Sequence, residues 1–123
     1  METQALGLIL ASIRDTNREL IVSPVHDVEI DAIRDFAERQ HLRNMLNQLG
    51  SKMSFDMFVI RKKAEYLANI GMGVADAAHV AFAEFAQADF VTVDDRLIKQ
   101  CKRMQIGVWC GSPLAYCDKE DLR

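Results

Sequence analysis

The sequence contains few cysteines, and their spacing excludes a zinc-finger type of site. There are only three, Cys101, Cys110 and Cys117, and they lack the close pairs that cysteine-based metal motifs need. An odd count, with no leader-like start to the sequence, predicts reduced thiols in a cytoplasmic protein. We therefore expect all three cysteines to be unreactive packing residues.

Long apolar runs and an excess of basic residues are also missing. No apolar stretch reaches the roughly 18 residues that a membrane-spanning helix needs, so we expect no membrane span. The formal net charge is −3, from 15 basic and 18 acidic residues. The bulk charge therefore does not indicate a strongly basic nucleic-acid-binding protein, although divalent metal ions can supply positive charge locally.

What is present is the composition of one globular domain. The chain has 123 residues, half of them hydrophobic, which is enough for one core. We predict a single domain over 1–117 and a frayed C-terminal tail over 118–123. The hydrophobic periodicity predicts the element order αβααααβαβα, which favours an α/β fold with a parallel sheet.

Only three strands are convincing in the sequence, and three are few for a self-sufficient sheet. We expect them at 19–23, 88–93 and 105–110. Gly50 and Ser51 are expected only to break a helix. The two prolines, Pro24 and Pro113, each follow a serine, and a Ser-Pro pair is typical of a helix start.

Acidic residues stand where the strands of such a sheet end. Asp76 lies at the start of the helix before the second strand, Asp94 just after that strand, and Glu29 in the helix after the first strand. All three can converge on the carboxyl edge of one parallel sheet. Clustered carboxylates repel each other unless a cation neutralises them, and Mg²⁺ or Mn²⁺ prefers such oxygen ligands. A metal held in this way activates water.

Each of these residues has a structural alternative. Asp76 and Asp94 can instead cap helices, although Asp95 could cap the second helix and leave Asp94 free. Glu29 in an early helical turn is favourable for dipole reasons alone. His79 lies one turn after Asp76 and can contact substrate, or it can be a buried, hydrogen-bonded histidine.

The basic run Arg61-Lys62-Lys63 has two interpretations as well. It is either a solvated helix face or the rim of a phosphate-binding site. Asp27 and Asp31 are interpreted as surface residues.

Several blocks, taken in order, resemble the PIN-domain nucleases, including their bacterial toxin-like members. The blocks are LIVSPV at 20–25 followed by Glu29, ADAAHVA at 75–81, ADFVTVD at 88–94, and Ser112-Pro113. The resemblance covers roughly residues 2–115. It implies a Rossmann-like α/β/α sandwich and a Mg²⁺- or Mn²⁺-dependent endoribonuclease, with RNA as substrate and an antitoxin protein as a possible partner.

The resemblance also implies roles for individual residues. Glu29, Asp76 and Asp94 would be the catalytic, metal-binding acids. Thr92 would support the site. Family members normally begin with a central strand that ends in an aspartate, and this sequence begins inside what resembles their first helix. Either the chain is truncated at its start or the protein has lost this strand, and in both cases we expect weak or no activity from this chain.

The absent strand has consequences for the sheet as well. It predicts a gap between the strand at 20–22 and the strand at 90–93. The gap can close by rearrangement of the chain or by an element exchanged within a homo-oligomer. The alternative function is a non-catalytic PIN-like remnant that binds a protein or RNA, or that oligomerises.

Overall fold

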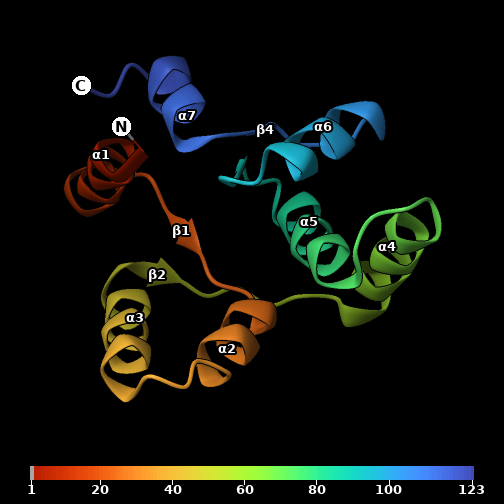
Figure 1. Cartoon of the computed structure of the whole chain (residues 1–123), viewed down its shortest axis with the longest axis horizontal. Coiled ribbons are helices and arrows are strands. Elements are labelled where there is room, and N and C mark those ends of the chain that lie inside the picture. The colour runs from red at the N-terminus through yellow and green to blue at the C-terminus, as the bar shows by residue number, and fades with distance from the viewer. Residues whose placement is uncertain (1) are drawn as a thin grey trace.

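The computed structural model describes residues 2–123, with side chains from Gln4 onward. The fold is mixed α/β and mostly helical, in agreement with the predicted class (Figure 1). Its elements are α1 (Glu2–Asp15), β1 (Leu20–Ile21), α2 (Pro24–Asp31), α3 (Phe36–Leu49), β2 (Gly50–Ser51), α4 (Met57–Asn69), α5 (Val74–Ala86), β3 (Phe90–Val91), α6 (Asp95–Arg103), β4 (Cys110–Gly111) and α7 (Pro113–Glu120).

The strands form two separate parallel pairs. β1 pairs with β2, with Leu20 opposite Gly50, and β3 pairs with β4, with Phe90 opposite Cys110. The predicted gap between the first and second strands is therefore confirmed within residues 2–123. The alternative that the chain closes this gap by rearrangement is wrong for these residues, because β1 and β3 do not pair with each other.

Three details of the sequence prediction need correction. The pair Gly50–Ser51, expected as a helix break, is also the strand β2. The last strand lies at Cys110–Gly111, at the end of the predicted range 105–110. The predicted tail at 118–123 begins later, because α7 continues to Glu120.

The helix starts follow local capping chemistry. Ser23 and Ser112 are the N-cap residues of α2 and α7, each followed by proline, as the two Ser-Pro pairs predict. The side chain of Asp56 accepts the backbone N–H groups of Phe58 and Val59 at the start of α4. These caps occupy N–H groups that the helix itself cannot bond.

The hydrophobic core lies mainly between α4, α5 and α6. Its buried members include Ile60, Leu67, Val80 and Leu97. By contrast, every residue of α3 is described and none is buried. The half of the chain from α4 to β4 therefore has its own core, which the half from β1 to β2 lacks.

The cysteines are free, and Cys101 and Cys117 are buried, as predicted. Burial, together with a hydrogen bond to Cys110, raises the pKa of Cys101 to about 12. A thiol with such a pKa is almost entirely protonated at neutral pH, and the thiolate is the reactive form.

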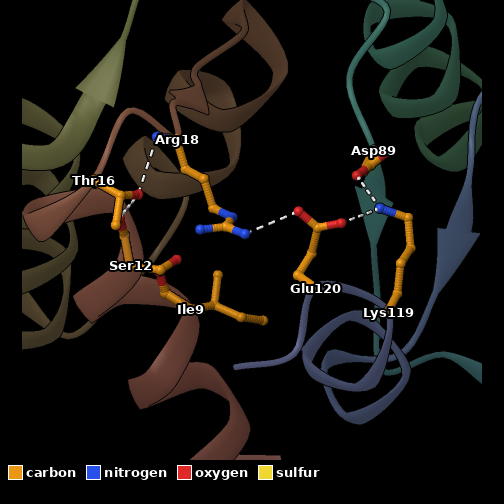
Figure 2. Close-up of polar contacts among 7 residues, drawn as sticks. All are labelled: Ile9, Ser12, Thr16, Arg18, Asp89, Lys119 and Glu120. Carbon is orange, nitrogen blue, oxygen red and sulfur yellow. Dashed lines mark hydrogen bonds and ion pairs between the residues drawn. The ribbon is translucent and has the colours of Figure 1, made fainter. Parts of the chain in front are cut away.

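A chain of ion pairs joins the two strand pairs at their amino ends (Figure 2). Arg18, just before β1, lies 3.0 Å from Glu120. Lys119 lies 2.8 Å from Glu120 and 3.0 Å from Asp89, which immediately precedes β3. The C-terminal turn of α7 therefore reaches the amino ends of both β1 and β3, so the two pairs have their amino ends at the same edge.

Candidate functional site

The opposite, carboxyl edge is where the predicted site residues lie. α2 begins directly after β1 at Ser23, and α6 begins directly after β3 at Asp94. α5 runs toward the amino end of β3, so its first turns, with Asp76 and His79, belong to the carboxyl edge. The helices that carry the predicted acids all start at this edge.

Glu29 and His79 are brought together. The Nε2 atom of His79 lies 2.9 Å from the Oε1 atom of Glu29, and this contact joins α2 to α5. The His79 side chain is 16% exposed and the Glu29 side chain 51% exposed. His79 is thus mostly buried and hydrogen-bonded, and its bonded partner is one of the predicted acids.

His26 is a further member of this cluster, which the sequence interpretation missed. Its Nδ1 atom accepts the backbone N–H of Ser23 at 3.0 Å, and its ring lies 5.0 Å from that of His79. Burial, and then the neighbouring His79, lower the pKa of His26. The sequence does carry a signal for this role of His26. It lies three residues after the N-cap residue Ser23, and a side-chain acceptor at that position completes a capping box.

Asp94 is engaged in a helix cap. Its Oδ1 atom accepts the backbone N–H groups of Arg96 and Leu97 at 3.0 and 3.2 Å. The hydroxyl of Thr92 accepts the backbone N–H of Asp94 at 3.2 Å and so fixes the turn that leads to the cap. Asp95 is the first residue of α6, so the N-cap residue is Asp94 and not Asp95.

Asp76 lies in the first turn of α5, after Gly73 at the N-cap. Among the side chains described, from residue 4 to 123, none forms a hydrogen bond or ion pair with its carboxylate. Capping does not account for Asp76, and the half-buried carboxylate adds to the factors that raise the pKa of Cys101.

The three acids do not form a metal site as they stand. Within the described part of the chain, no three histidine, cysteine, aspartate or glutamate side chains are placed to hold a metal ion. Glu29 is bonded to His79 and Asp94 to the start of α6. In this arrangement two of the three predicted acids are therefore engaged with other groups of the chain.

A cavity separates the two strand pairs, and we call it the inter-sheet slot. Its volume is about 500 Å³, and it is bordered by Leu20 and Ile21 of β1 and by Phe90 and Val91 of β3. Ser23, His26 and His79 lie at its carboxyl end. The candidate site and the slot are therefore contiguous.

The basic run at 61–63 takes part in structural contacts. Lys63 lies 3.6 Å from Glu84, and the Lys62 ammonium lies over the ring of Phe58 at 5.0 Å. Asp27 and Asp31, interpreted as surface residues, both bond to Arg43 of α3.

Comparisons with family models, with curated proteins and with solved structures give no match to this chain. Among the described residues, no helix is both long and apolar enough to cross a membrane.

Proposed function

We propose that this chain is a PIN-type, Mg²⁺- or Mn²⁺-dependent endoribonuclease with weak or no activity. The observation that carries the proposal is the contact between His79 and Glu29 at the carboxyl edge. This contact joins α2, which carries Glu29, to α5, which carries both His79 and Asp76. In α/β proteins with parallel strands, sites form at this edge.

The arrangement of the acids supports the low activity. Metal-assisted hydrolysis needs several oxygen ligands around the ion, and the described side chains do not offer three together. Glu29, Asp76 and Asp94 remain our proposed metal and catalytic acids. Thr92 supports Asp94 through its turn, and His79 is the proposed contact to RNA.

The proposal extends to architecture and partners. The proposed architecture is a PIN-like α/β/α sandwich, whose sheet is represented in residues 2–123 by two separate strand pairs. An antitoxin protein is a partner that the sequence resemblance implies.

A cleavage assay with matched variants tests the activity. The protein is incubated with a mixed RNA pool and Mn²⁺, and Asp94→Asn is compared with Asp56→Asn. Both aspartates cap a helix in the same way, and asparagine caps as well as aspartate. We expect any Mn²⁺-dependent cleavage to be lost in Asp94→Asn and kept in Asp56→Asn. Cleavage that survives both Asp94→Asn and Asp76→Asn would refute the mechanism.

The second candidate is a non-catalytic module that binds a protein or RNA. The inter-sheet slot favours it, because an open apolar cavity beside free strand edges is suited to binding. This candidate predicts RNA retention in a filter-binding assay that is unchanged by a metal chelator, with no cleavage at any Mn²⁺ concentration. Chelator-sensitive cleavage would favour the nuclease instead.

A further inference from the structure

The inter-sheet slot is bordered on two sides by strand edges that, within residues 2–123, have no neighbouring strand. In β1, the N–H of Val22 bonds the Ser51 carbonyl at 3.0 Å, so residues 20 and 22 face β2. Successive residues of a strand direct their backbone groups to opposite sides. The N–H and C=O of Ile21 therefore face away from β2, toward the slot that Ile21 lines.

β3 presents the same arrangement from the other side. The N–H groups of Phe90 and Thr92 bond the carbonyls of Trp109 and Gly111 at 2.8 and 3.0 Å, so these residues face β4. Val91 then directs its N–H and C=O toward the slot. Within residues 2–123, each of β1 and β3 has one strand neighbour, on the side away from the slot.

The two other walls of the slot are apolar. One is a face of α1, made by Leu6, Ile9, Leu10 and Ile13. The other is the end of α5, made by Phe82, Ala83 and Ala86. A strand between them would be covered on both faces, and such strands are continuously hydrophobic.

The ends of the slot set the length of its occupant. The ion-pair chain of Arg18, Glu120, Lys119 and Asp89 lies at the amino end, and Ser23 lies at the carboxyl end. The chain covers roughly five residues between Arg18 and Ser23, about 16 Å at ~3.3 Å per residue. The four groups of this ion-pair chain are already paired with one another, so they do not require a charged ligand.

We propose that the slot binds an extended, continuously apolar segment of about five residues, donated by a partner polypeptide. The segment would bond to Ile21 on one edge and to Val91 on the other. It would convert two strand pairs into one five-stranded sheet. The proposal rests on the strand edges and the apolar walls, and it holds whether or not the chain cleaves RNA.

A second copy of the chain is a poorer occupant. The strands of residues 2–123 are already paired within their own half-sheets. If two copies exchanged one of these strands, each copy would lose a strand for every strand gained. After such an exchange each copy therefore still has one empty strand position. A segment donated by another polypeptide would fill that position.

The test uses a synthetic peptide with the sequence KKVIVLVKK and the complete 123-residue chain. The control peptide has the same side chains but carries N-methyl groups on alternate apolar residues, which removes the N–H donors of one edge. Amide hydrogen exchange is followed by NMR at Ile21 and Val91, with Val22 and Thr92 as internal references. We expect the unmodified peptide to slow exchange at both test amides by at least about tenfold, because a bonded amide exchanges only on opening.

Two outcomes with the peptides would overturn the proposal. One is equal binding of the N-methylated peptide, which would mean apolar adhesion without strand pairing. The other is unchanged exchange at Ile21 and Val91 when the unmodified peptide is saturating. A third outcome would also overturn the proposal. If Ile21 and Val91 are protected without peptide, in a species that sediments as a dimer, the occupant of the slot is a second copy of the chain.

A matched pair of variants locates the binding. Ala83→Phe fills the slot from α5, whereas Ala75→Phe adds the same ring on the same helix at an exposed position outside it. We expect the first variant to abolish peptide-induced protection and the second to keep it. Circular dichroism establishes that each variant folds. If Ala83→Phe does not fold, Ala86→Leu serves as the second slot-filling variant. Peptide-induced protection that is undiminished in a folded slot-filling variant would contradict the proposal.

Discussion

The two halves of the molecule differ in how they are held together. The half from α4 to β4 packs α4, α5 and α6 around buried residues such as Leu67, Val80 and Leu97. In the half from β1 to β2, α2 buries Ile30 and α3 buries nothing, although all residues of both helices are described. The two halves therefore differ in how much of their helical surface is buried, and the half from β1 to β2 has the smaller share.

A core truncation in each half should give the largest effects and sharpen this difference. Leu67→Ala removes a side chain that is 1% exposed and should lower the free energy of unfolding by about 3–5 kcal/mol. Leu46→Ala in α3 removes a half-buried side chain and should cost less than about 1.5 kcal/mol. Urea denaturation measures both. Equal losses would contradict the proposed difference between the halves.

Removal of a helix cap should lower the free energy of unfolding less than the core truncation Leu67→Ala does. The size of this loss should also differ between the two halves. Asp94→Ala should cost about 1 kcal/mol, because two N–H groups of α6 lose their acceptor, and Asp94→Asn should cost only a few tenths. Asp35 caps α3 in the same way. If α3 unfolds before the core, Asp35→Ala should change local exchange in α3 and leave the urea midpoint unaltered. A shift of the midpoint as large as that of Asp94→Ala would refute early unfolding of α3.

The pH dependence of stability should report on His26, beside the slot. Its pKa is lowered by burial and by His79 from an ordinary value of 6.5. Just below pH 6.5 the unfolded chain therefore binds more protons than the folded chain, and the free energy of unfolding falls as the pH is lowered. The loss levels off once the pH is below the folded pKa.

His26→Gln serves as the matched variant for this measurement. Glutamine three residues after Ser23 keeps a side-chain acceptor for the capping box but does not titrate. We expect urea midpoints measured from pH 7.5 to pH 5 to decline less in the variant than in the natural chain. Parallel declines would mean that His26 does not contribute.

The ion-pair chain at the amino edge should give the smallest effect. Glu120→Gln removes the carboxylate that bridges Arg18 and Lys119. These groups are partly exposed, so the melting temperature should fall only slightly at low salt. The difference from the natural chain should vanish in about 1 M NaCl, where charges are screened within about 3 Å. A difference that persists in high salt would point to lost packing instead.

The sequence predicts the helices better than the strands. Ser23-Pro24 and Ser112-Pro113 start helices by local chemistry, and periodicity identifies the apolar face of α5. The strand β2 could not be predicted, because it has only two residues and one of them is glycine, which is depleted in strands. It exists through its pairing with β1, and a side chain at Gly50 would overlap Val22. Such a close approach is visible only in three dimensions.

The candidate site was predictable in its location but not in its contacts. Strand ends indicated the carboxyl edge, and Glu29 and Asp76 lie on helices that begin there. Sequence spacing could not tell whether the carboxylates point at one another, because side-chain bonds decide that. Asp94 bonds its own helix and Glu29 bonds His79. The bond from His79 to Glu29 spans fifty residues, and no local pattern encodes it.

The central claim is that β1 and β3 each present an unpaired edge to the inter-sheet slot. Amide hydrogen exchange of the chain without any added peptide tests it most directly. We predict fast exchange at Ile21 and Val91, and slow exchange at the adjacent Val22 and Thr92, whose N–H groups bond Ser51 and Gly111. Equal protection of Ile21 and Val22, and of Val91 and Thr92, would contradict the claim.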